Sequence, residues 1–218
     1  LNIILFLLIF FILSIQVASE LKLGWDAKWF WYIKSLYYSE NQTFSELSNY
    51  VMNDYHPHLG SFLWSFFREI SINRYEYSGR LFYIYFYIVG IYFITSDIFT
   101  SKIKNNILFL LVIFITHKYT YFSGLQEILI FTILIFISKF LYDFIKDKKQ
   151  INLFFICLCL NLLIWIKAEG IAYAFMCLVT INFISSLNLK QRLYINIFFL
   201  FIILFKIFVY KFFEIKVN

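Results

Sequence analysis

The sequence predicts an all-α protein that crosses a membrane about seven times, and three observations lead to this fold class. Hydrophobic residues make up 62% of the 218 residues, charged residues only 15%, and the mean hydropathy is +0.77. A soluble domain of this length has too little interior for so much apolar surface. Several apolar runs approach the ~20 residues that a helix needs to cross a bilayer. Only one proline and six glycines interrupt the chain.

The apolar runs define the expected spans. The first run carries no basic residues at its start and is long for a signal peptide, so we expect it to be retained as a span. The expected spans are 1–19, 80–101, 103–122, 123–143, 151–167, 169–187 and 192–213. A further apolar piece, Pro57–Ile70, has too few apolar residues before Arg68 and Glu69 to cross ~30 Å of hydrocarbon.

The basic residues predict the orientation. With seven spans, one set of short loops holds only Lys118 and Lys167. The opposite set holds Lys102, Lys104, Lys146, Lys148, Lys149, Lys190 and Arg192. Cytoplasmic loops are enriched in lysine and arginine, so the second set is predicted to be cytoplasmic. An eighth span at Pro57–Ile70 would reverse this bias, and we therefore expect that piece to lie on the membrane surface.

Residues 20–79 are then one long loop on the non-cytoplasmic side. The loop holds two amphipathic pieces, Trp25–Tyr38 and Pro57–Ile70, which are rich in tryptophan, tyrosine and phenylalanine with scattered basic residues. Helices of this composition lie in the headgroup layer of a bilayer. We treat residues 1–218 as a single transmembrane domain, made of the first span, this loop and six further spans at 80–213.

Asp26 lies in the aromatic stretch GWDAKWFWYIKSLYY, where a carboxylate is costly to hold. On a helical wheel it falls on the apolar side, beside Trp29 and Ile33. One explanation is that Asp26 caps the helix that follows it. The other is a catalytic carboxylate at the membrane surface, because ionisable groups near a membrane are functional by default. A cap explains a carboxylate at a helix start but not its aromatic surroundings.

Other ionisable residues are expected at the same membrane face. Glu127 opens a span and is either functional or a solvated helix start. Lys167 and Glu169 lie at a turn between spans, as site residues or as an interfacial anchor with its counter-charge. His56 and His58 flank a proline and resemble a metal pair without a third ligand. A divalent metal is therefore left open, and no other cofactor is expected.

Four stretches, in order along the chain, resemble the GT-C superfamily of integral-membrane glycosyltransferases, in particular its bacterial members similar to dolichyl-phosphate-mannose–protein mannosyltransferases. They are GWDAKWFWYIKSLYY, DYHPHLGSFLWSFF, YFSGLQEILIF and IWIKAEGIAYAF. The family more often has Tyr-Pro-Pro-Leu where His56 and His58 stand, and an aspartate where Glu127 stands. Family members are commonly longer, so we expect this chain to be an N-terminal fragment.

The resemblance implies a reaction and a site. The donor would be a polyprenyl-phosphate-linked sugar, and the acceptor a hydroxyl of a glycan, lipid or protein at the outer face of a bacterial inner membrane. Asp26 and Glu127 would be the catalytic carboxylates, and the sugar would be transferred with inversion. The implied substrate-binding residues are His56, His58, Arg68, Lys118, Lys167 and Glu169.

Other functions are left open by the sequence. A lipid-linked glycan polymerase or ligase, a non-catalytic membrane subunit and a transporter are the alternatives. Transport is disfavoured because the centres of the expected spans are almost purely apolar. The net charge of +6 does not indicate nucleic-acid binding, since no basic cluster has the spacing of a recognition helix.

Overall fold

The computed structural model describes residues 3–20, 22–40, 46, 57–118, 122–184 and 187–215. Within these ranges the chain is helical without strands, which confirms the all-α part of the predicted fold class. Its elements are α1 (Ile3–Ser19), the π-helical segment η1 (Ala27–Tyr32), α2 (Ile33–Ser39), α4 (Leu59–Glu69), α5 (Glu76–Thr95), α6 (Lys102–Thr116), α7 (Glu127–Asp147), α8 (Gln150–Ile166), α9 (Gly170–Asn182) and α10 (Leu189–Phe212).

Three of the described helices are long and apolar enough to cross a membrane: α5, α7 and α10, with 20, 21 and 24 residues. Helices α1, α8 and α9 are apolar but shorter, with 17, 17 and 13 residues. Because a helix rises ~1.5 Å per residue, α9 covers only about 20 Å of a hydrocarbon core that is ~30 Å thick. By length and composition, three of the described helices could therefore cross a membrane. The seven-span topology stays a prediction.

The span predicted at 80–101 is shorter than expected, because α5 ends at Thr95. The side chain of Asn105 on α6 explains the early end. It accepts a hydrogen bond from the Phe99 amide at 2.9 Å and donates one to the Ser96 carbonyl at 2.7 Å. These bonds satisfy backbone groups that would otherwise need a continuing helix. The chain turns here and returns as α6.

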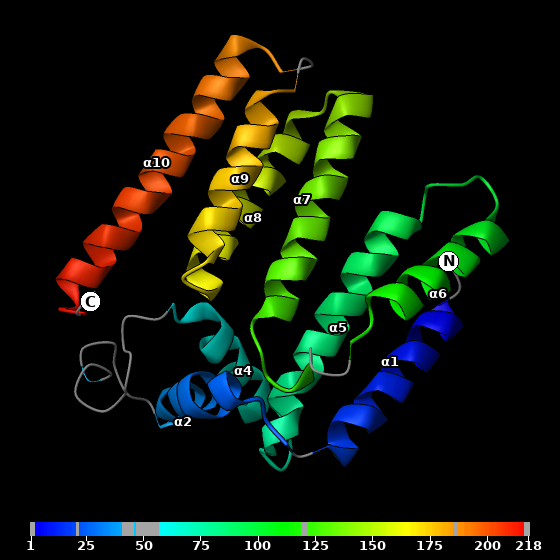
Figure 1. Cartoon of the computed structure of the whole chain (residues 1–218), viewed down its shortest axis with the longest axis vertical. Coiled ribbons are helices and arrows are strands. Elements are labelled where there is room, and N and C mark those ends of the chain that lie inside the picture. The colour runs from blue at the N-terminus through cyan, green and yellow to red at the C-terminus, as the bar shows by residue number, and fades with distance from the viewer. Residues whose placement is uncertain are drawn as a thin grey trace.

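The helices form an elongated bundle (Figure 1). Helices α7, α8, α9 and α10 lie side by side, α5 packs against α7, and both α1 and α6 pack against α5. Helices α2 and α4 pack on each other at the end of the bundle where α7 begins and α10 ends. They correspond to the two amphipathic pieces of the predicted loop, and they bring that loop to the N-terminus of α7.

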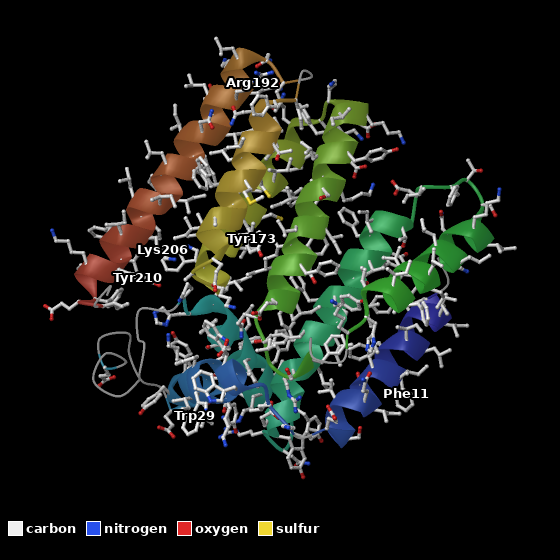
Figure 2. All side chains as sticks on the ribbon, viewed as in Figure 1. Phe11, Trp29, Tyr173, Arg192, Lys206 and Tyr210 are labelled. Atoms are coloured by element: carbon white, nitrogen blue, oxygen red, sulfur yellow. The ribbon has the colours of Figure 1, made fainter. Side chains whose placement is uncertain are left out.

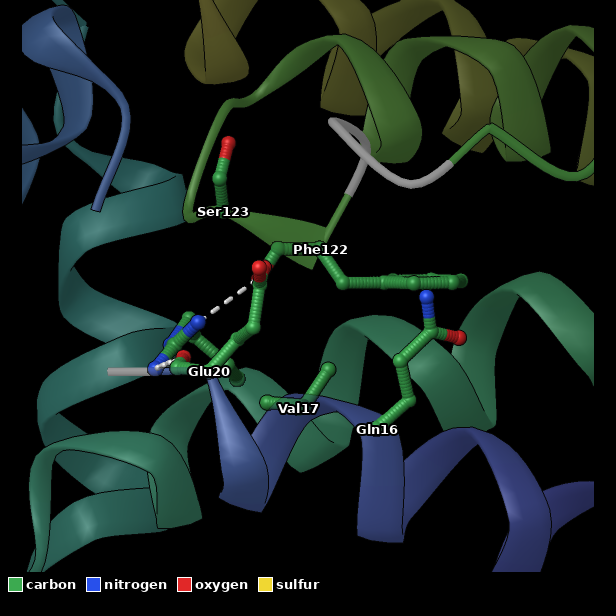
Figure 3. A pocket seen from close by; sticks show the side chains of 6 residues that line it. Gln16, Val17, Glu20, Phe122 and Ser123 are labelled. Atoms are coloured by element: carbon green, nitrogen blue, oxygen red, sulfur yellow. Dashed lines mark hydrogen bonds between the residues drawn. The ribbon is translucent and has the colours of Figure 1, made fainter. Parts of the chain in front are cut away.

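Arg80 fastens three separate segments at this end of the bundle. Its side chain is buried and donates two 2.7 Å hydrogen bonds to the Glu76 carboxylate. It also donates to the carbonyls of Phe122, at 3.0 Å, and Glu20, at 3.2 Å, beside the small cavity in Figure 3. A buried cation with this many acceptors is well compensated. The end of α1, the start of α5 and the segment before α7 are therefore held together.

Candidate functional site

The segment that carries Asp26 is held against the start of α7 by close backbone contacts. The Gly24 amide donates a 2.9 Å hydrogen bond to the Ser123 carbonyl. Gly124 has a φ of +89°, which favours glycine, and a Cβ at this position would lie 2.9 Å from the Cβ of Ala27. The glycines therefore allow two strongly separated parts of the sequence to approach each other.

The turn between α8 and α9 is equally tight. A Cβ on Gly170 would collide with the Leu163 carbonyl, so only glycine fits. The Gly170 amide donates a 3.0 Å hydrogen bond to the Lys167 carbonyl. This turn fixes Lys167 and Glu169 at the same end of the bundle as the start of α7.

Lys167 is the centre of a charge cluster. Its Nζ lies 2.6 Å from Glu127 Oε1 and 3.6 Å from Glu169 Oε1. Burial lowers the pKa of Lys167, but the hydrogen bond to Glu127 and the charges of Glu127, Glu169 and Asp26 outweigh this effect, so the pKa is raised. We call these four residues the Lys167 cluster. The structure thus brings together four site residues that the sequence predicted in three separate stretches.

The Lys167 cluster has more carboxylate oxygens than the described residues supply with hydrogen-bond donors. Two carboxylates, those of Glu127 and Glu169, lie within ion-pair distance of one ammonium group, the charge of Asp26 adds to theirs, and the Lys167 side chain is only 15% exposed. Glu127 Oε2 is enclosed and, among the described residues, has no hydrogen-bond partner. An enclosed carboxylate oxygen without a donor is costly. The parts of the cluster that a ligand can reach are the exposed portions of Glu127 and Glu169, 45% and 59%, and these can accept hydrogen bonds from hydroxyl groups.

Asp26 does not act as a helix cap. Within the described part of the chain its carboxylate makes no capping hydrogen bond to the turn that follows. That turn is the π-helical segment Ala27–Tyr32, and such wide turns are rare and often found at functional sites. The tryptophans of this segment differ in exposure: Trp31 is buried, whereas Trp25 and Trp29 are exposed at the surface.

Two predicted cations lie apart from the Lys167 cluster in their described contacts. Arg68 on α4 donates hydrogen bonds to the Arg74 carbonyl at 3.1 Å and to Ser39 Oγ at 3.3 Å. Lys118 follows the end of α6 and is exposed. Their predicted role in substrate binding stays a prediction.

The two predicted histidines have different outcomes. His56 lies outside the described residues. His58 is buried and packs its ring against Tyr38 and Tyr210, with centroid distances of 6.4 and 6.1 Å. Burial, together with neighbouring Tyr210, raises the pKa of Tyr38, so this phenol stays neutral. In the ranges that the structure describes, no group of three or more potential ligands could hold a metal ion.

Sequence reasoning missed a buried cation on α10. The Lys206 side chain is 8% exposed, and its Nζ donates a 2.8 Å hydrogen bond to the Ile164 carbonyl. The amine also lies 5.7 Å from the ring of Trp165 and 5.4 Å from that of Tyr210. The signal was present, because Lys206 is a single charge inside the apolar run FLFIILFKIFVY.

Comparison with known proteins adds no relative of this chain. No protein-family model, no curated protein and no solved structure matches it. The likeness to GT-C glycosyltransferases accordingly rests on the four sequence stretches alone, and what that likeness implies about activity stays a prediction.

Proposed function

We propose that the chain is a membrane glycosyltransferase that moves a sugar from a polyprenyl phosphate to an acceptor hydroxyl. One observation carries this proposal: Glu127 and Glu169 pair with Lys167, and the charge of Asp26 from a third segment also acts on it, at one end of an apolar helical bundle. Charged groups are expensive at such a place and need a functional reason. The half-exposed carboxylates of Glu127 and Glu169 and the uncapped carboxylate of Asp26 supply that reason.

The proposed topology has seven spans, formed by α1 and by α5 to α10, with α2 and α4 lying on the outer surface. Its support is the charge bias of the short loops, which assigns the Lys167 cluster to the non-cytoplasmic side. Helices α6 and α9 are shorter than ~20 residues, so they cross only with flanking residues or a locally thinner bilayer.

The proposed reaction is a single displacement. Asp26 takes the proton of the acceptor hydroxyl while the hydroxyl oxygen attacks the anomeric carbon of the sugar. The bond between that carbon and the phosphate oxygen breaks, and its electron pair leaves with the polyprenyl phosphate. The new glycosidic bond has the inverted configuration, and the proton on Asp26 passes to water.

The other members of the Lys167 cluster have binding roles in this proposal. The half-exposed carboxylates of Glu127 and Glu169 accept hydrogen bonds from sugar hydroxyls. Lys167 is oriented by its 2.6 Å ion pair with Glu127. Its positive charge favours the phosphate that leaves, since charge-assisted hydrogen bonds to phosphate are stronger than neutral ones.

The proposal is tested by incubating the purified chain, in lipid nanodiscs, with a panel of sugar-labelled polyprenyl phosphates and hydroxyl acceptors. We expect one donor to release polyprenyl phosphate and form a product of inverted anomeric configuration. Matched polyprenyl pyrophosphate sugars form the control panel. Turnover of the pyrophosphates alone would indicate a polymerase or ligase. A folded protein that uses no donor would contradict the proposal and favour a non-catalytic subunit.

A further inference from the structure

Helices α8 and α10 border an apolar groove of about 500 Å³, and almost all of its lining is hydrocarbon. The groove begins at Gln150, the first residue of α8, and at Gln191, near the start of α10. From there its lining runs to Cys157 on α8 and to Phe201 on α10. The groove therefore lies beside the first halves of both helices, at the end of the bundle where α7 ends (Figure 1).

The depth of the groove is compatible with one leaflet of a bilayer. Gln150 and Cys157 are seven positions apart (157 minus 150), and Gln191 and Phe201 are ten positions apart (201 minus 191). Along a helix these separations are about 10 and 15 Å, and half of the hydrocarbon core is about 15 Å thick. A lipid chain that enters at the two glutamines would fill the groove without crossing the midplane.

Exposed lysines flank the two glutamines at which the groove begins. One lysine directly precedes each glutamine, and two more lie in the last turn of α7 and the α7–α8 connection. We call these four residues the basic rim: Lys146, Lys148, Lys149 and Lys190. The contact of Lys190 with the groove is direct, because its Nζ lies 5.8 Å from the ring of Tyr194, which lines the groove.

The basic rim has an excess of positive charge. Its one carboxylate neighbour in the stretches 146–150 and 187–192 is Asp147, which lies 3.5 Å from Lys149. The other three lysines of the rim are in no ion pair within the ranges that the structure describes. Four lysines and one aspartate leave three positive charges (four minus one), and Arg192 adds another in the same turn as Gln191. Figure 2 shows Arg192 at the start of α10, far from Lys206 and Tyr210.

We infer that the α8–α10 groove binds an acyl chain of an anionic phospholipid, and that the basic rim holds the phosphate of its headgroup. Clusters of lysine and arginine at the ends of membrane helices attract anionic headgroups. A zwitterionic phospholipid carries its own counter-charge, whereas an anionic one leaves a negative charge for the rim to compensate. The inference takes from the proposed function only its topology, which assigns the groove to the cytoplasmic leaflet, and does not depend on sugar transfer.

Charge also disfavours a second copy of the chain as the occupant of the groove. In a symmetric dimer the same surface of both copies forms the interface. Two copies joined through the groove in one membrane would have the same orientation, so their basic rims would meet at the same depth. Like charges brought together oppose association. An anionic lipid covers the same apolar surface and supplies the opposite charge.

The test compares two phospholipids that have identical acyl chains, each with a photoreactive diazirine in the chain. One is phosphatidylglycerol, which is anionic, and the other is phosphatidylcholine, which is zwitterionic. The full chain is placed in nanodiscs that hold both lipids in equal amounts, and mass spectrometry locates the crosslinked residues after illumination. The measured quantity is the ratio of anionic to zwitterionic crosslinks at 150–157 and 191–201. The same ratio on α1, an apolar helix without charged residues, is the internal reference.

We expect the ratio at the groove to exceed the ratio on α1 at least about fivefold, the attraction that one basic residue exerts on an anionic surface. The double variant Lys149→Gln with Lys190→Gln should remove most of this preference. Its matched control, Lys102→Gln with Lys104→Gln, changes two exposed lysines at the start of α6 and should keep the preference.

A plug separates binding in the groove from simple attraction to the lysines. Cys157→Trp fills the groove and should abolish the preference for anionic crosslinks at 150–157 and 191–201. Leu158→Trp, the next residue of α8 and outside the groove lining, should keep it. A preference that survives Cys157→Trp would overturn the inference, because the lipid would then gather at the lysines without entering the groove.

Equal ratios at the groove and on α1 in the wild-type chain would also overturn the inference, and this comparison needs no variant to fold. A groove that reacts with neither lipid, in a chain that is dimeric in detergent, would assign the groove to a second copy. The proposed function fails separately. Lipid preference without sugar transfer contradicts the function alone, and sugar transfer without lipid preference contradicts the inference alone.

Discussion

Two lysines at opposite ends of α7 each meet two carboxylates, and their surroundings differ. Lys139 lies toward the C-terminal end of α7, and its Nζ is 2.8 Å from Asp97 and 2.6 Å from Asp143. The rings of Phe93 and Tyr142 cover the same amine at 5.5 and 5.6 Å. The Lys139 side chain is 4% exposed. Its ion pair with Asp97 joins α7 to the segment after α5, and its ion pair with Asp143 lies within α7.

The Lys167 cluster, at the other end, is more open and more acidic. Its two direct partners, Glu127 and Glu169, are 45% and 59% exposed, and the charge of Asp26 is added to theirs. One oxygen of Glu127 has no donor among the described residues. A lysine that is almost fully buried between its partners serves packing, whereas a more acidic cluster with exposed carboxylates is arranged for a ligand.

The largest expected effect on stability belongs to Lys139. We expect Lys139→Met to lower the free energy of unfolding by about 2–3 kcal/mol, mainly because Asp143, only 22% exposed, then loses the cation that compensates it. Chemical unfolding in detergent measures this loss. Lys146→Met, at an exposed site near the end of the same helix, is the matched control and should cost little. If both variants lose the same free energy of unfolding, Lys139 has no special structural role.

A smaller loss is expected from the turn that holds the Lys167 cluster. Gly170→Ala places a methyl group against the Leu163 carbonyl and should cost about 1–3 kcal/mol, the usual range for overpacking. Because the turn must open, Lys167 moves and sugar transfer should fall as well. Ala168→Gly, on the exposed side of the same turn, should keep transfer. If Gly170→Ala keeps both stability and transfer, the turn does not position the site.

The substitution Lys167→Met sharpens the comparison, because it repeats the Lys139 change at the open end. We expect it to lower the free energy of unfolding by only about 1 kcal/mol or less, since both partner carboxylates are half exposed. Sugar transfer should nevertheless fall at least about tenfold with the loss of a charged phosphate contact. A loss of stability as large as that of Lys139→Met would make the Lys167 cluster another packing element.

The smallest expected effect is a dependence of stability on alkaline pH. The pKa of Lys167 is raised in the folded protein, so its charged form stabilises the fold. This contribution is complete below the unfolded value of 10.5 and is lost as pH rises through the higher folded pKa. Unfolding measured from pH 8 upward should show the decline, and Lys167→Met should flatten it. An unchanged decline in the variant would assign it to other groups.

The all-α class and the approximate places of the helices could be predicted, because apolar runs of span length leave few other choices. The early end of α5 could not, since it depends on the side chain of Asn105 bonding to a loop six residues away. Helix lengths also escaped prediction for α9, which ends at Asn182 rather than near 187. Hydropathy reports where a segment is apolar and does not report which local hydrogen bonds end its helix.

The candidate site was predicted in part. Asp26, Glu127, Lys167 and Glu169 could be grouped because the predicted topology gave them one membrane face. The contacts of Glu127 and Glu169 with Lys167 depend on close approaches at Gly124 and Gly170 that no sequence pattern reports. The N-cap explanation for Asp26 was left open by the sequence and is not supported by the structure. The contacts of Lys206 could not be predicted, because its partners Ile164 and Trp165 lie on another helix that no sequence pattern aligns with it.

The most direct test of the central claim measures sugar transfer by Asp26→Asn beside Asp97→Asn. Each variant neutralises one carboxylate of one lysine cluster, and asparagine keeps the shape of aspartate. If Asp26 is the general base, Asp26→Asn should lower transfer by at least about 10²-fold with unchanged stability. Asp97→Asn should lower stability and leave transfer per folded molecule unchanged. A well-folded Asp26→Asn protein that transfers sugar at the normal rate would contradict the account.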